Sequence, residues 1–105
     1  MELYQIKYML RVAEYRSFSK AAQTLSITQP TLTQQIGKLE AELGILLFRR
    51  TTRSVSLTNA GQDFVAYASR VLEAVEDLKD VMRSYRTSMY GHIRIGVMPS
   101  IALFN

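Results

Sequence analysis

The side chains best suited to specific hydrogen bonding lie in one short stretch, which contains Thr28, Gln29, Pro30, Thr31, Thr33 and Gln34. A glutamine amide presents donors and an acceptor in one plane, and it can bond adenine N6 and N7 in a bidentate fashion. A threonine hydroxyl can bond a base or a phosphate, and its methyl group can meet a thymine methyl. These residue types therefore favour contact with the edges of base pairs.

A helix over residues 29–43 is expected to position these side chains. Thr28 is the predicted N-cap, Pro30 falls in the first turn, and Gly44 supplies a left-handed cap. The buried stripe of this helix comprises Leu32, Ile36, Leu39 and Leu43. The opposite face carries Gln29, Pro30, Thr33, Gln34 and Gly37. A glycine inside a helix costs about 1 kcal/mol relative to alanine, and here it would let a DNA backbone approach closely.

Two shorter helices are predicted before it, over residues 2–15 and 18–25, from apolar residues spaced three and four apart. Ser17 or Ser19 can cap the second of them. Joined to the helix over 29–43 by residues 26–28, it forms a helix-turn-helix of about residues 18–37. In that motif the second helix enters the major groove of DNA.

The next segment is apolar at residues 45–48 and then basic. Residues 49–57 favour two short strands with a polar turn at about 52–54. A two-stranded ribbon is not stable alone and must lean on the helices. The sequence thus predicts a mostly α fold, a winged helix-turn-helix with a two-stranded wing.

A long helix is predicted between its cap at Thr58 and its end at Gly91. Its apolar residues follow a strict spacing of four and three, a coiled-coil-like seam that needs a partner helix. We expect this seam to form a dimer through Phe64, Ala68, Val71, Val75, Leu78, Met82, Tyr85 and Met89. Residues 91–97 alternate as a strand does, so we expect a truncated second domain to begin there. The expected parts are therefore residues 1–58, 59–90 and 91–105.

The positive charge is concentrated in the first part of the chain. Residues 1–60 hold eight Lys and Arg against four Asp and Glu, whereas residues 61–105 hold five of each. This asymmetry favours a polyanionic partner for the first part only. With no cysteine and one histidine, the chain shows no pattern typical of an enzyme or a metal centre. It has no apolar run long enough for a membrane span, and we expect a cytoplasmic protein.

Many spaced positions follow one known pattern. They are Phe18, Ala21-Ala22, Leu25, Thr28–Thr33, Leu39-Glu40, Leu43-Gly44, Leu47–Arg50, Arg53, Val55, Leu57-Thr58 and Ala60-Gly61. This pattern resembles that of bacterial LysR-type transcriptional regulators and extends over residues 1 to about 61 without a gap. The long helix and the following segment fall where that family places its linker helix and the start of its effector-binding domain.

The resemblance implies particular roles. Base-facing positions of the recognition helix would be Gln29, Pro30, Thr33 and Gln34. Thr31 would touch phosphate at the positive end of the helix dipole. Arg53 would be the wing-tip residue, and Arg49 and Arg50 would begin the wing. Position 34 is often basic in the family and is glutamine here, so a target sequence cannot be carried over from relatives.

The resemblance also implies how the protein would act. A homodimer would bind an inverted-repeat promoter site, and the full-length protein could assemble further to a tetramer. The fragment itself would need no cofactor, whereas the full-length protein would respond to a small-molecule inducer through its second domain.

Structural alternatives remain open for several residues. Thr28 and Thr31 can cap the helix, contact phosphate, or do both. Gln29 and Gln34 can be solvated, and Gly37 can be an incidental helix glycine.

The arginines and the long helix also have other readings. Arg49 or Arg50 can pair with Glu40 or Glu42, and Arg53 can be a solvated turn residue. A protein-interaction module built on the long helix is the alternative function, but it explains neither the amide face nor the basic wing.

Overall fold

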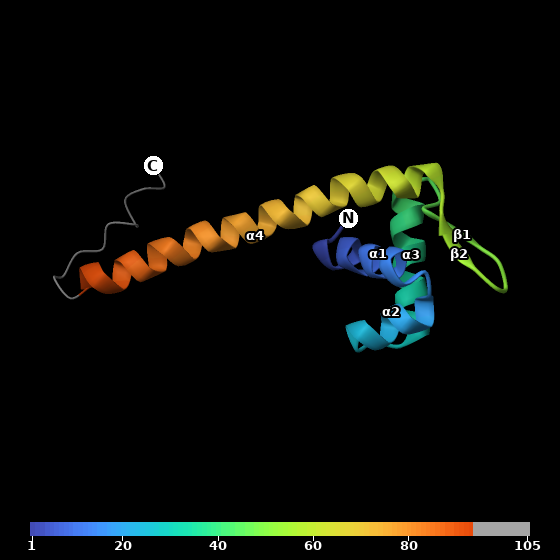
Figure 1. Ribbon diagram of the computed structural model, residues 1–105, viewed down its shortest axis with the longest axis horizontal. Coiled ribbons are helices and arrows are strands. Elements are labelled where there is room, and N and C mark those ends of the chain that lie inside the picture. The colour runs from blue at the N-terminus through green and yellow to red at the C-terminus, as the bar shows by residue number, and fades with distance from the viewer. Residues whose placement is uncertain (94–105) are drawn as a thin grey trace. The chain divides into compact units, whose positions relative to one another are not determined.

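The computed structural model describes residues 1–93, with side chains up to residue 87. Its elements are α1 (Leu3–Tyr15), α2 (Phe18–Leu25), α3 (Gln29–Leu43), β1 (Phe48–Arg50), β2 (Val55–Leu57) and α4 (Asn59–Ile93) (Figure 1). The chain divides into two units, Met1–Leu72 and Glu73 onward, and α4 contributes to both. The predicted mostly α, winged helix-turn-helix fold is confirmed.

Local capping explains where the first three helices begin and end. The side chains of Glu2 and Gln5 form a capping box, so α1 begins at residue 3 and Glu2 is its N-cap rather than its first residue. Of the two serines predicted as caps of α2, Ser17 accepts a hydrogen bond from the Lys20 N–H. Helix α3 has the predicted bounds, and Gly44 ends it in the left-handed conformation with φ 70°.

The three helices and the wing share one apolar core. Its fully buried members come from the three helices and from the residue before β1: Met9 and Val12, Ala21, Leu32, Ile36 and Leu39, and Leu47. The two alanines of α2 allow close packing, because a small side chain lets another helix approach. This core holds one face of α3 and leaves its polar face free.

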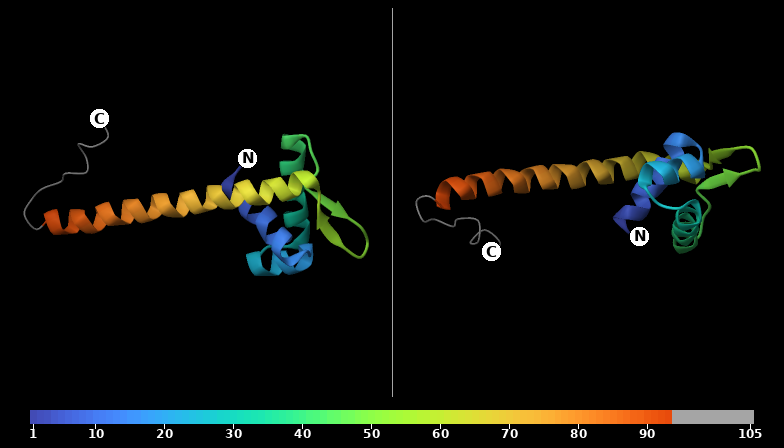
Figure 2. Two further views of the ribbon diagram at one scale, coloured as in Figure 1. Left: turned by 45° about the horizontal axis from the view of Figure 1, so that its top comes forward. Right: turned by 90° about the horizontal axis from the view of Figure 1, so that it is seen from below.

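The wing is an antiparallel hairpin in which β1 pairs with β2 (Figure 2). Its register joins Phe48 to Leu57, Arg49 to Ser56 and Arg50 to Val55. Strand β1 therefore begins at Phe48, one residue earlier than predicted. The physical reason is that the buried Phe48 ring packs edge-on against Phe18 at 5.8 Å, which draws the apolar residue into the sheet.

Helix α4 continues to Ile93, so the prediction that Gly91 ends it is wrong. A single glycine weakens a helix by about 1 kcal/mol but ends it only when it takes a left-handed conformation. Residues 91–93 of the predicted strand over 91–97 are therefore helical, and residues 94–105 lie outside the described part of the chain.

The start of α4 belongs to the core of the first unit. Phe64 and Val65 pack against the core cluster, and Ala68 is buried within the single chain. Of the residues assigned to the dimer seam, Ala68 is therefore buried and Phe64 half-buried within the single chain. A spacing of four and three does not distinguish contacts inside the domain from contacts between chains.

Thr58 joins the start of α4 to the two residues just before the wing. Its hydroxyl accepts from the Gly61 N–H at 3.0 Å, as an N-cap does, and donates to the Leu46 carbonyl at 2.7 Å. Its own N–H donates to the Leu47 carbonyl at 3.0 Å. This close approach requires a glycine at position 61, because a Cβ there would lie 2.1 Å from the Leu47 carbonyl oxygen.

Replacement of Gly61 by alanine is expected to destabilise the fold by about 1–3 kcal/mol, the usual cost of overpacking. Gly37→Ala is the matched control, since a Cβ at Gly37 meets nothing within 4 Å. That change should instead stabilise the chain by about 1 kcal/mol through helix propensity. Urea unfolding followed by circular dichroism measures both. Equal effects of the two substitutions would show that the backbone contact at Gly61 is unimportant.

Candidate nucleic-acid interface

Helix α3 presents a free polar face. Gln29, Pro30, Thr31, Gln34 and Gly37 are exposed, as a base-reading helix requires. Thr33 is half-buried, at the border with the core. The helix is held from its other side by completely buried leucine and isoleucine side chains, so its exposed face is placed by the core and not by its own contacts.

The start of α3 uses both threonines that the sequence left ambiguous. The Thr28 hydroxyl accepts a hydrogen bond from the Thr31 N–H at 3.3 Å and donates to the Thr31 hydroxyl at 2.8 Å. Thr28 is therefore the N-cap. Both side chains are exposed, so a further partner can still reach them. The preceding turn depends on Ser26, which takes the left-handed conformation with φ 57°.

The wing tip is a tight turn that presents Arg53. The Thr51 hydroxyl accepts from the N–H groups of Arg53 and Ser54 at 3.3 and 3.0 Å, and the Thr51 N–H donates to the Ser54 carbonyl at 2.9 Å. These bonds order the backbone of the turn without using the Arg53 side chain, which is exposed. Arg49 is exposed on β1, and no ion pair to it occurs among the residues described here.

A concave surface of about 430 Å³ lies between α3 and the wing, and we call it the α3–wing surface. Its lining includes Gln29 and Thr33 of α3 together with Arg50 and Arg53 of the wing. Four predicted site residues, which lie between positions 29 and 53 of the sequence, thus line one surface. The other predicted residues, Thr28, Pro30, Thr31, Gln34 and Arg49, are exposed but do not line it.

The turn between α1 and α2 adds three residues to this surface that the sequence did not suggest. They are Arg16, Ser17 and Ser19. Arg16 ends α1 in the left-handed conformation with φ 50°, and the two serine hydroxyls lie 3.3 Å apart at the start of α2. Only folding brings Arg16 near Arg53, because the residues lie far apart in sequence. The serines could have been noticed, since caps at helix starts often bind anions.

Arg50 is committed to contacts within the protein. Its guanidinium pairs with the Glu40 carboxylate at 3.2 Å and lies over the Phe18 ring, 4.6 Å from its centroid. The other acidic candidate, Glu42, pairs with the N-terminal amine at 2.7 Å. Of the pairings left open by the sequence, Arg50 with Glu40 is the one that forms. Arg53 and Arg16 are thus better placed than Arg50 to meet an external anion.

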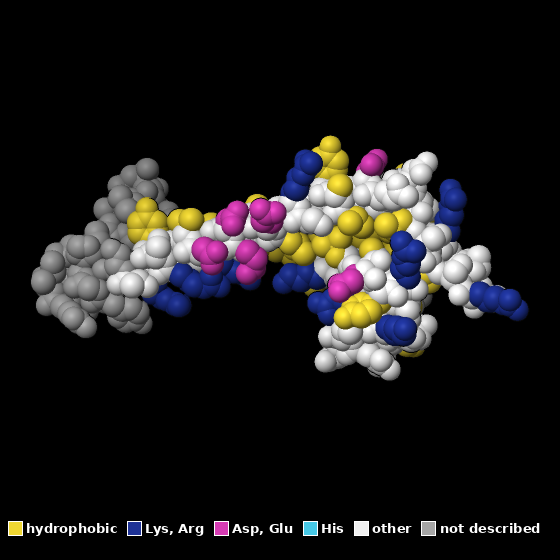
Figure 3. Space-filling model, in the orientation of Figure 1, with side chains coloured by type: hydrophobic (Ala, Val, Ile, Leu, Met, Phe, Trp, Pro, Cys, Tyr) yellow, Lys and Arg dark blue, Asp and Glu magenta, His cyan; other side chains and the backbone are white. Residues whose placement is uncertain are grey.

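The distribution of charge differs between the first unit and the rest of α4. Lys and Arg side chains are spread over the helices and the hairpin, whereas on α4 a group of Asp and Glu side chains lies beside Lys and Arg side chains (Figure 3). Ion pairs within α4 join Glu76 to Lys79 and Asp80 to Arg83. The excess of positive charge therefore lies on the unit that carries the α3–wing surface.

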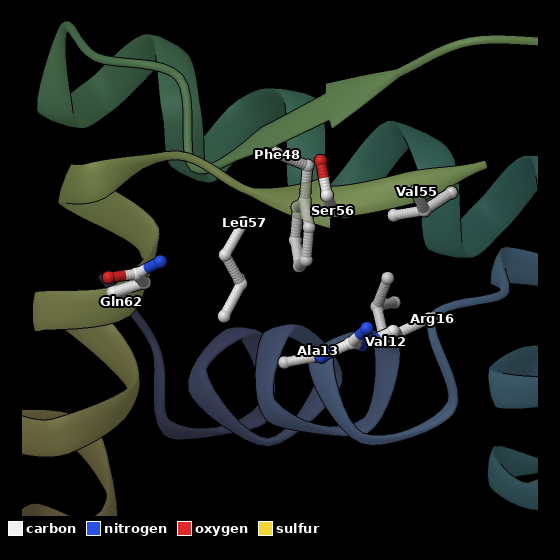
Figure 4. A pocket seen from close by; sticks show the side chains of 8 residues that line it. All are labelled: Val12, Ala13, Arg16, Phe48, Val55, Ser56, Leu57 and Gln62. Atoms are coloured by element: carbon white, nitrogen blue, oxygen red, sulfur yellow. The ribbon is translucent and has the colours of Figure 1, made fainter.

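Among the side chains that the structure describes, up to residue 87, no group of three or more His, Cys, Asp or Glu could hold a metal ion. None of the helices within residues 1–93 is long and apolar enough to cross a membrane. A second pocket, of about 180 Å³, lies between α1 and the wing and is lined largely by apolar side chains (Figure 4).

A helix-turn-helix with a free second helix beside a two-stranded wing defines the class of winged helix-turn-helix DNA-binding domains. The family described as "Bacterial regulatory helix-turn-helix protein, lysR family" matches residues 3–62. The chain belongs to this family. The predicted membership among LysR-type regulators is thereby confirmed.

Known relatives are bacterial transcription regulators. The chain is 40% identical over 101 residues to the DNA-binding transcriptional dual regulator OxyR of Escherichia coli (strain K12). The match covers 96% of this chain and 33% of that protein. It is 41% identical over 102 residues to the HTH-type transcriptional regulator BudR of Klebsiella aerogenes, and the match covers 97% of this chain and 71% of that protein. The chain thus spans about one third of the length of OxyR.

Solved structures share the fold. The BenM_DBD/catB site 1 DNA complex is 42% identical with a TM-score of 0.78, and the match covers 80% of this chain and 93% of that one. The CbnR_DBD–DNA complex is 40% identical with a TM-score of 0.78, and the match covers 80% and 97%. Both similar domains were solved bound to DNA.

Proposed function

We propose that this chain is the sequence-specific DNA-binding module of a LysR-type transcription regulator and that it binds double-stranded DNA as a homodimer. The observation that carries the proposal is the amide and hydroxyl face of α3, exposed beside a wing whose tip presents Arg53. Two similar domains, which are 42% and 40% identical to this chain, were solved in complexes with DNA.

Helix α3 would enter the major groove, whose width admits an α-helix. Gln29, Thr33 and Gln34 would read base edges, and Gly37 would leave room for the backbone of the DNA. Thr28 and Thr31, at the start of the helix, would meet a phosphate, where the positive end of the helix dipole adds attraction.

The wing would lie over the DNA next to the groove that α3 occupies. Arg53 would reach a flanking phosphate or the minor groove, and Arg49 would contribute charge from β1. Arg16, Ser17 and Ser19 line the same surface and would add phosphate contacts. Such contacts fix the register of a protein on DNA while the bases supply specificity.

Helix α4 would join two chains. Its apolar face stays exposed beyond the domain core, with Leu78 at 59% and Met82 at 46% exposed. Val71 and Tyr85 continue the same spacing, and Tyr67 and Val81 widen the face. A stripe this long in water favours pairing with a second helix. The Met89 side chain, also assigned to the seam, lies outside the described side chains.

The full-length protein would add regulation to binding. One set of relatives is named "Hydrogen peroxide-inducible genes activator", which describes control by a small molecule. We infer a small-molecule inducer for this protein as well, bound by a part of the protein that follows the DNA-binding module. A dimer, or a tetramer of the full-length protein, would occupy an inverted-repeat promoter site.

Gln29→Ala is expected to relax base preference at one position of the target by about 1–3 kcal/mol, the value of one bidentate contact. The measurement is a binding titration on duplexes selected from random sequence and on each single-base variant. Gln23→Ala, an exposed glutamine of α2 outside the α3–wing surface, is the control and should leave the preference unchanged. Equal losses on selected and random DNA would contradict a reading role for Gln29.

Arg53→Ala is expected to weaken binding to all sequences alike and to lower the salt slope by about one, because one phosphate contact is lost. The slope is measured from affinities at a series of salt concentrations. Lys7→Ala removes the same charge from an exposed site on α1 that does not line the surface. The proposed contact is refuted if both substitutions change the slope equally.

Leu78→Asp is expected to convert the dimer into a monomer, since it places a charge in the apolar seam. Sedimentation equilibrium of the chain measures the mass directly. Thr87→Asp adds the same charge on the opposite side of α4, at 100° per residue, and should leave the dimer intact. A monomeric parent chain, or a dimer that tolerates Leu78→Asp, would remove the seam from the proposal.

A further inference from the structure

The carboxylate of Glu40 is buried at the point where α3 meets the wing. Its side chain is 8% exposed, and Oε2 accepts hydrogen bonds from the Leu47 N–H at 2.7 Å and the Phe48 N–H at 3.3 Å. Those two groups are the foot of the wing. A buried carboxylate with such partners is costly to leave unpaired, so it holds the backbone of the wing against α3.

Arg50 extends this attachment to the far end of β1. Its guanidinium donates to Glu40 Oε1 at 3.2 Å and stacks over the Phe18 ring of α2. The Arg50–Val55 pair is the last rung of the sheet before the tip. Arg53 lies only three residues further along the chain. One glutamate therefore holds both ends of β1 in place relative to the recognition helix.

Apolar packing beneath the wing is incomplete. The pocket of about 180 Å³ opens between the hairpin and α1, and Val55 and Leu57 on its wall are only half-buried (Figure 4). A gap in packing forfeits the contacts that would otherwise fix a strand. Val55 and Leu57 pack against the core cluster from one side only, so the attachment through Glu40 and Arg50 adds a polar restraint on the tip half of the hairpin.

We propose that Glu40 and Arg50 are positioning residues for DNA recognition: together with the Phe18 ring they hold the wing at the height beside α3 at which Arg53 meets the flanking DNA. The proposal rests on the proposed DNA-binding function and goes further, because it assigns a positioning role in DNA recognition to a buried acidic side chain. Glu40 acts through Arg53 and touches no DNA itself.

The direction in which Glu40→Gln changes DNA affinity separates a positioning role from a general effect of net charge. Glu40→Gln removes a negative charge, and by electrostatic attraction alone the chain would bind DNA more tightly. A glutamine oxygen can still accept from the Leu47 and Phe48 N–H groups, but its neutral amide gives Arg50 no ion pair. Under the proposal Glu40→Gln instead weakens binding, by about the same factor as Arg53→Ala, on the order of tenfold for a charged hydrogen bond.

The test uses the 105-residue chain and two duplexes that it selects from random sequence. One duplex keeps several flanking base pairs, and the other is trimmed to the bases under α3, so that the wing has nothing to contact. We expect Glu40→Gln to bind the long duplex about tenfold more weakly than the parent and the trimmed duplex equally well. General damage to the fold would weaken both, and that outcome overturns the proposal.

A double-mutant cycle with Arg53→Ala supplies the second criterion. If Glu40 acts through Arg53, Glu40→Gln costs no further affinity once Arg53 is alanine, whereas independent sites would add. Additive losses, or tighter binding by Glu40→Gln, refute the proposal. Thermal unfolding without DNA shows whether Glu40→Gln is folded at the assay temperature.

Arg50→Met decides the question if Glu40→Gln does not fold. Methionine keeps an apolar contact with Phe18 but cannot pair with Glu40, and its effect must likewise vanish in the Arg53→Ala background. If the parent chain itself shows no salt-sensitive, sequence-selective binding, the proposed function fails. If the parent and Arg53→Ala behave as expected while the cycle is additive, only the positioning role fails.

Discussion

The buried Glu40 carboxylate is the interaction on which the two DNA-facing parts of this domain depend. Two backbone N–H groups and one guanidinium converge on it, and they come from the foot and the far end of a single strand. The three-residue strands alone could not hold a hairpin at a defined position, and Val55 and Leu57 beside the pocket beneath them are only half-buried. Because a buried charge must be paired, the partners of Glu40 help to fix the position of the hairpin.

Thr58 and Gly61 connect the same region to α4. The threonine caps the helix and bonds the Leu46 and Leu47 carbonyls, and the glycine lets the helix backbone approach them. The end of α3, the foot of the wing and the start of α4 therefore meet within a few residues. In a regulator this junction links the helix proposed for dimerisation to the helix proposed for base reading, because Thr58 and Glu40 both bond the backbone of Leu47.

The exposed surfaces of the chain fall into two chemical kinds. The α3–wing surface is polar and basic, and it combines rigid backbone with free amide, hydroxyl and guanidinium groups. Beyond the domain core, the seam of α4 is apolar and exposed at Val71, Leu78, Met82 and Tyr85 in the single chain. The α3–wing surface suits a hydrated polyanion, whereas the seam suits the apolar face of a second helix. The proposed binding to DNA and the proposed dimerisation would therefore use different surfaces of the module.

The sequence by itself determined where the four helices lie, the caps of α3 and its amide face, because these depend on local spacing and on neighbouring groups, whereas the predicted end of α4 at Gly91 was wrong. Gly44 and Thr28 are examples, since each satisfies backbone groups within a few residues. It also determined the family. Tertiary structure alone decided that Arg50 pairs with Glu40, that Arg16 lies near Arg53, and that Phe64 and Ala68 pack inside the domain. Those outcomes depend on which residues distant in sequence share a space, and a periodic pattern is the same whether its apolar face meets its own core or another chain.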